Sequence, residues 1–333
     1  MKSIVTKGLL GTIAASFMFI HTNAMALAKG ADVSWVSEME ASGYTFYNSN
    51  GNKQDLFAIL KSYGINSIRL RLWVDSNYYN NVDDVINKAK RAKAAGMKIM
   101  LDFHYSNTWA DPGHQATPSA WSSYDFNGLM KAMWWYTHDA LTEIKDAGIT
   151  PTWVQVGNET NDGMMWPYGK ASKHMQNFTY LINTGYDAVK NVFPDAKVIV
   201  HLANCQDRTV LKWLFDGIGD HGAKYDIIGA SIYPTTASGM TWQQAESACY
   251  SNLNYLVSRY NKDVMITEIG ASWNDSNAQN IVSTMINYVK NVNNGRGLGV
   301  FYWEPEAANF QSYTMGAWNP NTMRPMSTLN AFK

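Results

Sequence analysis

Short apolar segments alternate with longer amphipathic ones along almost the whole chain. The short segments predict eight β-strands, at 31–36, 66–73, 98–104, 152–158, 197–203, 226–233, 263–269 and 298–304. The amphipathic segments predict helices near 53–63, 82–95, 126–147, 173–192, 209–219, 241–260 and 276–292. Gly64, Gly96 and Gly148 each follow one of these helices and Pro194 follows another, as expected of helix stop signals.

The regular alternation of strands and helices favours parallel βα units, and eight such units close a barrel. The expected fold class is therefore α/β, a single (β/α)₈ TIM barrel with its active site at the C-terminal ends of the strands. An open doubly wound sheet is the alternative, and the lack of a G-x-G-x-x-G turn after the first strand weighs against it. No linker or repeat interrupts residues 30–333, so the sequence predicts one domain, residues 29–333.

Residues 1–28 have the layout of a secretory signal peptide. Lys2 and Lys7 form a short basic region, and an apolar run of small residues follows at 8–20. Two A-x-A sites then allow cleavage after Ala26 or after Ala28. The run is shorter than the roughly 20 residues of a membrane span, and a buried N-terminal helix is the alternative. We expect a secreted protein, in the medium or the periplasm.

The composition narrows the range of partners. The 27 basic and 27 acidic residues give a formal net charge of zero. A balanced chain has no general attraction to nucleic acid or to an anionic membrane. Aromatic residues make up 13% of the chain and include 13 Trp and 19 Tyr. This richness fits a large core, and it also fits a cleft that stacks rings on neutral sugars.

The chain has two cysteines, Cys205 and Cys249. In an exported protein an even number of cysteines favours a disulfide, so we expect these two to pair. Neither cysteine lies in a CxxC motif or beside a cluster of histidines, which argues against a zinc site.

The second predicted strand carries an unusual pattern of charge. Strict alternation places Ile68, Leu70 and Leu72 on one face, and Arg69 and Arg71 on the other. The apolar face of a barrel strand meets the outer helices, so both arginines are expected to point inward. Because an unpaired buried guanidinium is very costly, carboxylates must lie within the barrel mouth.

Other strands supply those carboxylates at the same end of the barrel. Asp102 shares a strand face with His104, Gln155 is in phase with Glu159, and Glu268 ends the seventh predicted strand. Hydrolysis of a glycosidic bond needs two carboxyl groups, one to donate a proton and one to attack the sugar or activate water. Glu159 and Glu268, on opposed strands, are therefore the expected catalytic pair. For either one alone, a loop salt bridge is the alternative.

At these residues the chain resembles a known family. Asn158-Glu159 and Glu268 are similar to the catalytic residues of clan A, the retaining glycosidases built on this barrel. Within the clan, the chain is similar to glycoside hydrolase family 53, the arabinogalactan endo-β-1,4-galactanases. The stretches that carry the resemblance are GADVS at 30–34, RLRLW at 69–73, DFHYSNTWADP at 102–112, QVGNE at 155–159, WP at 166–167 and YWEP at 302–305. They span nearly all of the predicted mature chain.

The resemblance implies that Glu159 is the general acid/base and Glu268 the nucleophile of a double displacement. We expect Arg71 to lie beside Glu268 and to keep it ionised, because a nearby cation lowers a carboxyl pKa. Glu159 must stay protonated near neutral pH, which needs a drier and less cationic setting.

The resemblance also implies a set of substrate-binding residues. Asn158 matches the residue that bonds the sugar 2-hydroxyl, and we expect a bulge at the strand end to aim it into the site beside Glu159. A capping role for Asn158 and a core role for His104 are the alternatives. Trp109, Trp166 and Trp318 are expected to form the walls of neighbouring subsites, and the alternative for each is a core or loop aromatic. The full expected set is Arg71, His104, Trp109, Asn158, Trp166, Tyr233, Trp303 and Trp318.

One departure from the family concerns metal binding. Many members carry a long loop after the seventh strand, and bacterial members often hold Ca²⁺ between the loops after strands seven and eight. Here Gly270 leads almost directly into a helix, and Asp275 and Asn277 are too few oxygen ligands for a Ca²⁺ site of six to eight oxygens. The sequence therefore favours the absence of bound calcium. We expect no required cofactor, no partner other than the polysaccharide, and a monomer.

The sugar itself rests on the resemblance alone. Another clan A retaining endo-glycanase, acting on β-1,4-glucan, mannan or xylan, is the nearest alternative. A galactan-binding barrel that has lost catalysis is the alternative from another class.

Overall fold

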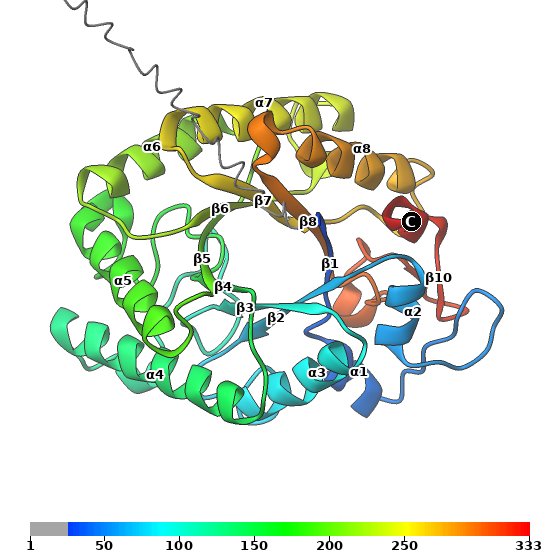
Figure 1. Ribbon diagram of the computed structural model, residues 1–333, viewed down its shortest axis with the longest axis horizontal. Helices are drawn as coiled ribbons and strands as arrows, with labels where there is room; N and C mark the ends of the chain where they lie inside the picture. Colours follow the sequence, from blue (N-terminus) through cyan, green and yellow to red (C-terminus); the bar gives the residue numbers. More distant parts are fainter. Residues whose placement is uncertain (1–25) are drawn as a thin grey trace, which may run out of the picture.

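The computed structural model describes residues 26–333. Eight parallel strands form a closed barrel in sequence order, with β1 paired to both β2 and β8 (Figure 1). The strands are β1 (Ala28–Asp32), β2 (Ser67–Leu72), β3 (Lys98–Phe103), β4 (Trp153–Val156), β5 (Lys197–Leu202), β6 (Ile227–Ile232), β7 (Asp263–Ile269) and β8 (Gly297–Trp303). The predicted barrel is confirmed, and the open sheet is excluded.

Helices surround the barrel, as Figure 1 shows. They are α1 (Val36–Ala41), α2 (Leu56–Ser62), α3 (Val82–Ala94), α4 (Phe126–Asp146), α5 (Ala171–Val192), α6 (Arg208–Asp220), α7 (Trp242–Tyr260) and α8 (Ala278–Lys290). Seven of them match the predicted helices to within a few residues. The short helix α1 and the two-residue strands β9 (Trp318–Asn319) and β10 (Arg324–Pro325) were not expected from the sequence.

The first strand begins three residues and ends four residues earlier than expected, and the cause of its early end is local. The Oδ1 atom of Asp32 accepts hydrogen bonds from both the backbone N–H and the hydroxyl of Ser34. These bonds turn the chain out of the sheet, and α1 then begins at Val36. The predicted leader lies outside the described residues for 1–25, and Ala28 already belongs to β1.

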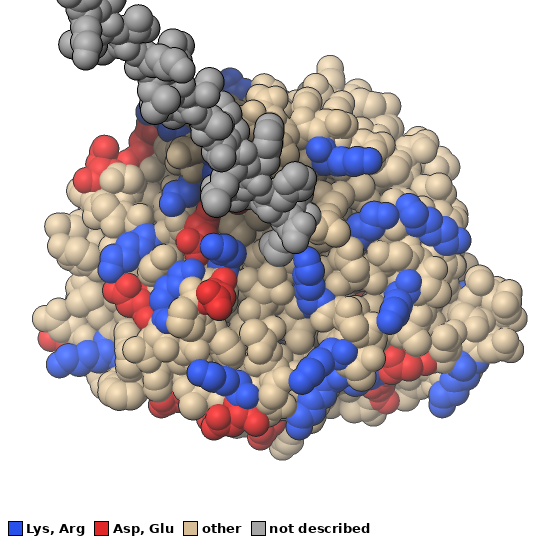
Figure 2. Space-filling model, viewed as in Figure 1, with Lys and Arg blue, Asp and Glu red and all other residues tan. Residues whose placement is uncertain are grey.

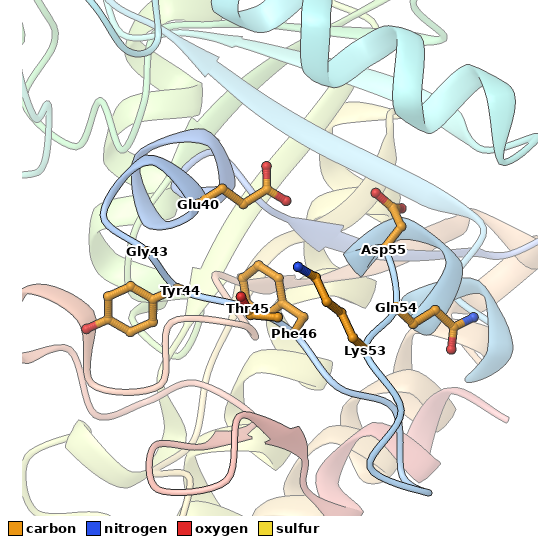
Figure 3. A pocket seen from close by; sticks show the side chains of 8 residues that line it. All are labelled: Glu40, Gly43, Tyr44, Thr45, Phe46, Lys53, Gln54 and Asp55. Atoms are coloured by element: carbon orange, nitrogen blue, oxygen red, sulfur yellow. The ribbon is translucent and has the colours of Figure 1, made fainter.

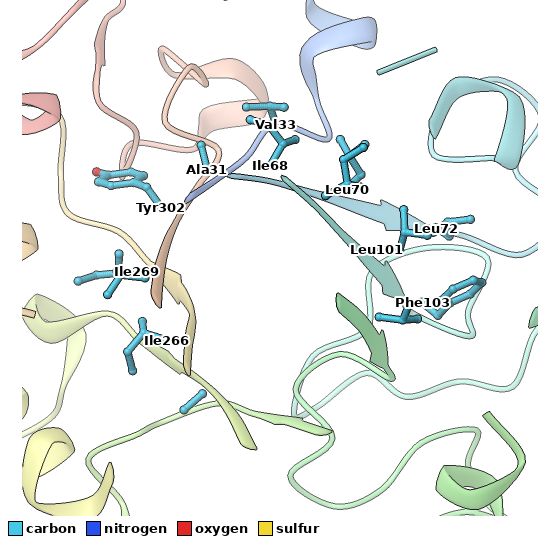
Figure 4. Close-up of a cluster of buried hydrophobic side chains, with 14 of the residues drawn as sticks. Ala31, Val33, Ile68, Leu70, Leu72, Leu101, Phe103, Ile266, Ile269 and Tyr302 are labelled. Carbon is cyan, nitrogen blue, oxygen red and sulfur yellow. The ribbon is translucent and has the colours of Figure 1, made fainter. Parts of the chain in front are cut away.

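The apolar face of each strand points outward, as alternation predicted. Figure 4 shows Ile68, Leu70 and Leu72 directed away from the barrel centre, with Leu101 and Phe103 of β3 beside them. All five are buried, because the helices cover them. The inward face is therefore left to polar side chains at the mouth and to a separate apolar layer below.

That apolar layer closes the N-terminal end of the barrel. Its members come from seven strands and are all at most 1% exposed: Ala28, Met100, Trp153, Ile199, Ile227, Met265 and Phe301. The interior of the barrel is therefore filled at this end, and the polar residues gather at the opposite end.

The surface and the cross-link agree with the sequence expectations. Cys205 and Cys249 form a disulfide that joins the segment after β5 to α7. Basic and acidic side chains are scattered between larger uncharged areas on the face seen in Figure 2. Within residues 26–333 there is no helix with the length and apolar character needed to cross a membrane.

Candidate active site

A cavity of about 210 Å³ lies at the C-terminal ends of the strands, and both glutamates line it. An oxygen of Glu159 and an oxygen of Glu268 lie within 4.8 Å of each other. Most of the sequence-predicted site residues meet at this cavity. Its lining consists of His104, Trp109, Ala110, Asp111, Asn158, Glu159, Tyr233, Glu268 and Trp303.

Arg69 organises the carboxylates beneath the cavity. It is 1% exposed, and its guanidinium lies 2.7 Å from Asp32, 2.8 Å from Asp102 and 2.9 Å from Glu268. Carboxylates in the barrel mouth were expected because two inward arginines need partners, and Arg69 has them. One cation facing three carboxylates leaves the site with excess negative charge. That charge suits a reaction that develops a positive sugar ring.

The two glutamates are in different electrostatic environments. Burial, and then the charge of Glu268, raise the pKa of Glu159 to about 8. Burial also raises the pKa of Glu268, while the Arg69 guanidinium and the hydroxyl of Tyr233 work in the opposite direction. Tyr233 donates its hydroxyl to Glu268 Oε2 at 3.0 Å. Of the two glutamates, only Glu268 forms a direct ion pair with Arg69. When the two glutamates together bind one proton, that proton therefore resides on Glu159.

The cation beside Glu268 is Arg69, not Arg71 as expected. Arg71 forms its ion pair with Glu304 at 2.6 Å, and its guanidinium carbon lies 4.3 Å from the centre of the Trp109 ring. Arg71 does not line the cavity, so it lies behind Trp109 rather than against a substrate. Alternation correctly predicted that both arginines point inward. It did not show that Arg69, the deeper of the two, is the one that pairs with Glu268 on β7.

The polypeptide turns sharply where Asn158 and Glu159 enter the site. β4 ends at Val156, and Gly157 and Glu159 then adopt left-handed conformations with φ of 83° and 46°. Both Asn158 and Glu159 consequently line the cavity, although strict alternation would separate them. The bulge expected at the strand end is replaced by this turn just beyond β4.

Asn158 is held on both sides of its amide. Its Oδ1 accepts from Arg69 Nη2 at 2.8 Å, and its Nδ2 donates to the carbonyl of Ala110 at 2.7 Å. This orientation is fixed by the side chain of Arg69 on β2 and by the backbone carbonyl of Ala110 in the loop after β3. The role of a helix cap, weighed as the alternative, is not seen for Asn158.

His104 links the aromatic wall to the carboxylates. Its Nδ1 accepts from Trp73 Nε1 at 3.2 Å and from the backbone of Ala110 at 3.3 Å. The ring proton therefore lies on Nε2, which is 3.0 Å from Asp102. His104 is buried but reaches the cavity edge.

Two tryptophans form the aromatic wall of the cavity. The rings of Trp109 and Trp303 are 5.8 Å apart and inclined at 63°. Trp35, which was not predicted, packs against both, at 5.6 and 5.1 Å. The wall therefore consists of platforms set at an angle to each other.

Trp166 and Trp318 lie away from the cavity. Trp318 is 0% exposed and packs on Phe46, so in this structure it is a core residue and not the wall of a subsite. Trp166 lines a separate depression of about 290 Å³, formed with Trp121 and other residues of the loops after β3 and β4. Lys170 lies 4.3 Å from the centre of the Trp166 ring.

Sequence reasoning missed several residues of the site. Asp111 lines the cavity. It belongs to the stretch 102–112 that carries the family resemblance, but it was not among the predicted site residues. His201 and Ser231 lie fully buried behind Glu159, and the alternation used for Arg69 would have placed both inside the barrel.

Metal-ligating side chains also meet here. Among the described residues, one group of three such side chains has ligand atoms within 4.8 Å of one another, namely Glu159, His201 and Glu268. Both ring nitrogens of His201 are already within hydrogen-bonding distance of protein atoms, and Arg69 is paired with Glu268. This group is therefore better suited to proton chemistry than to holding a cation. Asp275, considered as a calcium ligand in the sequence analysis, accepts a hydrogen bond from the backbone N–H of Asn277.

A further depression lies outside the barrel mouth. It has a volume of about 460 Å³ and lies between α1 and α2, lined by Glu40, Gly43, Tyr44, Thr45, Phe46, Lys53, Gln54 and Asp55 (Figure 3). Arg91 bridges its two carboxylates, at 2.8 Å from Glu40 and 2.6 Å from Asp55. It contains none of the predicted site residues.

Comparison with known proteins places the chain among enzymes. The sequence profile described as Glycosyl hydrolase family 53 matches residues 28–281 and 275–330. An arabinogalactan endo-β-1,4-galactanase of Thermothelomyces thermophilus is 36% identical over 306 residues, which are 83% of this chain and 89% of the relative.

Solved structures give the same picture. A structure of fungal β-1,4-galactanases is similar with a TM-score of 0.84 at 32% identity, covering 92% of this chain and 99% of the other. The Ignisphaera aggregans GH53 catalytic domain is similar with a TM-score of 0.83 at 27% identity, covering 92% and 95%.

Proposed function

This chain belongs to glycosyl hydrolase family 53, and on that premise we propose that it hydrolyses internal β-1,4-galactosidic bonds. The substrates are galactan and type I arabinogalactan, the side chains of pectin. The names of the relatives support this substrate, since those with 36% and 32% identity are an arabinogalactan endo-β-1,4-galactanase and an endo-β-1,4-galactanase.

The mechanism we propose is a retaining double displacement, and one observation carries it. Oxygens of Glu159 and Glu268 lie within 4.8 Å of each other. Retaining enzymes place their two carboxyl groups about 5–5.5 Å apart, whereas inverting enzymes need about 6.5–9.5 Å to admit a water molecule between sugar and base. The separation leaves room for the sugar carbon but not for that water.

In the first step Glu268 attacks the anomeric carbon while Glu159 donates its proton to the leaving oxygen. The ion pair with Arg69 and the hydroxyl of Tyr233 keep the attacking oxygens of Glu268 aimed and ionised. Glu159 retains its proton near neutral pH, because burial and the charge of Glu268 raise its pKa.

In the second step Glu159 acts as a base instead of an acid. Formation of the ester removes the charge of Glu268, so the pKa of Glu159 falls after it has given up its proton. Glu159 then takes a proton from the incoming water, which attacks the anomeric carbon and releases Glu268.

The remaining cavity residues bind the sugar in this proposal. Asn158 presents its amide toward the 2-hydroxyl, an interaction that strengthens in the transition state. Trp303 stacks under the reacting sugar and Trp109 forms an adjoining wall. β-1,4-Galactan is a curled chain because of its axial linkage, and platforms inclined at 63° fit it better than coplanar platforms would.

Product analysis on linear β-1,4-galactan tests the proposal. We expect early release of oligosaccharides of several lengths, with β-anomers formed first in proton NMR spectra, and negligible hydrolysis of cellulose, mannan and xylan. Hydrolysis of one of those polymers instead would assign the chain to another specificity within the clan. Binding of galactan without hydrolysis would indicate the non-catalytic alternative.

We further propose that residues 1–28 direct export and that the enzyme is a monomer in solution. The basic start, the short apolar run and the A-x-A sites support the first part. Fractionation of expressing cells and size-exclusion chromatography with light scattering test the two parts separately.

A further inference from the structure

Arg71 lies behind the aromatic wall and close to three tryptophan rings. Its guanidinium carbon is 4.3 Å from the centre of the Trp109 ring, 5.2 Å from that of Trp73 and 5.5 Å from that of Trp35. Arg71 is 1% exposed and does not line the cavity. Any effect of Arg71 on a substrate therefore passes through the side chains around it.

Tryptophan rings take the place of hydrogen-bond acceptors around Arg71. Its Nε and Nη2 atoms are buried and have no hydrogen-bond partner among residues 26–333. A buried guanidinium without acceptors is costly, and ring faces offset part of that cost because they attract a cation electrostatically. This attraction requires the ring face to be turned toward the cation, so it favours one orientation of the ring. Trp109, at the shortest of the three distances, is the ring most strongly affected.

Glu304 fixes the guanidinium of Arg71 in this position. The Oε1 atom of Glu304 lies 2.6 Å from Arg71 Nη1, and its Oε2 atom accepts the backbone N–H of Trp35 at 3.1 Å. Glu304 is 0% exposed and directly follows Trp303, the last residue of β8. One carboxyl therefore connects the cation to the backbone of Trp35 and, along the chain, to Trp303.

The rings of the wall also pack on one another edge to face. The Trp35 ring is inclined at 78° to Trp109 and at 61° to Trp303. Trp109 and Trp303, which both line the cavity, are inclined at 63° to each other. Edge-to-face contacts favour particular ring angles. A movement of Trp109 away from Arg71 would therefore change the angle between the two rings that line the cavity.

We propose that Arg71, held by Glu304, is the positioning residue of Trp109 and sets the angle of Trp109 to Trp303. The ligand at these rings is the β-1,4-galactan chain, so this inference rests on the proposed function. The cation keeps the Trp109 ring inclined as the wall that adjoins the reacting sugar. Arg71 thereby determines how tightly the chain is bound, without touching the reacting atoms.

A double-mutant cycle tests whether Arg71 acts through Trp109. Arg71→Lys keeps a cation opposite Glu304 but loses the planar guanidinium that lies over the ring. We expect KM for galactan to rise roughly tenfold, the order of one buried cation–π contact, with kcat changed by less than about threefold. Trp109→Ala should raise KM at least as much. The double variant should show no further rise, because the ring through which Arg71 acts is already absent.

Arg91→Lys is the matched control. The guanidinium carbon of Arg91 lies 4.6 Å from the centre of the Phe57 ring, and Arg91 pairs with Glu40 at 2.8 Å and with Asp55 at 2.6 Å. None of these residues lines the catalytic cavity. We expect KM and kcat of this variant to equal those of the wild type. A rise of KM as large as in Arg71→Lys would show an effect that is not specific to the wall, and would overturn the proposal.

Thermal unfolding of each variant shows whether it folds. A misfolded fraction lowers kcat per mole of protein and leaves KM unchanged, so a general structural defect does not produce the expected pattern. If Arg71→Lys does not fold, Glu304→Gln takes its place in the cycle. Glutamine keeps an acceptor for the N–H of Trp35 but weakens the hold on Arg71.

Two kinetic results would overturn the proposal. Rises of KM that add in the double variant would show that Arg71 does not act through Trp109, and a lower kcat with unchanged KM would indicate a structural role. Crystal structures of the wild type and Arg71→Lys add a test without substrate. We expect the angle between Trp109 and Trp303 to depart from 63° in the variant, and an unchanged angle would overturn the proposal. If the wild type does not cleave galactan, the proposed function fails, while this angle still decides the role of Arg71.

Discussion

Arg69 shows how far a single residue can be interpreted from sequence. Alternation alone placed it inside the barrel and required carboxylate partners. The identity of those partners depends on neighbours in space, since Asp32, Asp102 and Glu268 come from β1, β3 and β7. The shear of the barrel sets which inward residues share a layer, and no local pattern reports it. The assignment of Arg71 to Glu268 failed for this reason.

The electrostatic coupling of the two glutamates gives the first prediction. In Glu268→Gln the charge that contributes to the raised pKa of Glu159 is absent, so that pKa should fall from about 8 toward its ordinary value. Titration of ¹³C-labelled glutamate by NMR in wild type and variant measures it. A Glu159 that titrates unchanged would show that burial alone sets its pKa.

The second prediction is that the stability of the protein depends on Arg69. Arg69→Met leaves three buried carboxylates without their cation, and we expect a loss of about 3–5 kcal/mol in the free energy of unfolding at pH 7. Without the cation, burial raises the folded-state pKa of these carboxyls above the unfolded value. Their penalty is then present at pH 7 and is relieved as pH falls through the raised pKa.

Urea unfolding of Arg69→Met and wild type at pH 7 and pH 5 measures this difference. The gap between the two proteins should narrow at the lower pH. A gap that is equal or wider at pH 5 would contradict the electrostatic explanation and indicate a packing defect. Lys88→Met is a useful comparison, because Lys88 is equally buried and pairs with Asp84 at 2.7 Å outside the site.

At the scale of elements, periodicity located seven strands and seven helices but failed where contacts override it. β1 ends at Asp32 because the side chain of Asp32 caps the next residues, although the apolar pattern continues to 36. The segment after β8 has no periodicity, so the burial of Trp318 against Phe46 could not be predicted. Family-like motifs located Glu159 and Asn158 but not the turn that aims them.

The start of β1 bears on the processing of the leader. Ala28 is 1% exposed in the lower apolar layer and pairs with Gly299 of β8, and the carbonyl of Leu27 accepts a hydrogen bond from Asn66 at 3.1 Å. Cleavage after Ala28 would remove these contacts, whereas cleavage after Ala26 would keep them. We therefore expect the mature protein to begin at Leu27.

Two recombinant proteins that begin at Leu27 and at Lys29 test this third prediction. The shorter one should lose roughly 1–3 kcal/mol of stability from lost apolar burial and one hydrogen bond. Thermal unfolding measures the difference, and N-terminal sequencing of the exported protein gives the natural start. Equal unfolding temperatures would remove the structural preference between the two sites.

At the scale of the whole molecule, the balance of charge matches the neutral polysaccharide. The formal net charge is zero, and charged side chains of both signs are scattered over the visible surface rather than gathered in one field (Figure 2). The excess negative charge of the site is buried around Arg69, where salt screens it poorly. Encounter with a neutral galactan chain should therefore depend on stacking and shape.

The last prediction follows from this separation of surface and site. Between about 0.05 and 0.5 M NaCl, KM and kcat on galactan should change by less than about twofold, since neither partner contributes a long-range field. Polygalacturonate, a polyanion found in the same plant material, should not inhibit at the lower salt concentration. A KM that rises steeply with salt, or inhibition by polygalacturonate, would reveal electrostatic recognition of the acidic pectin backbone, which a formal net charge of zero does not favour.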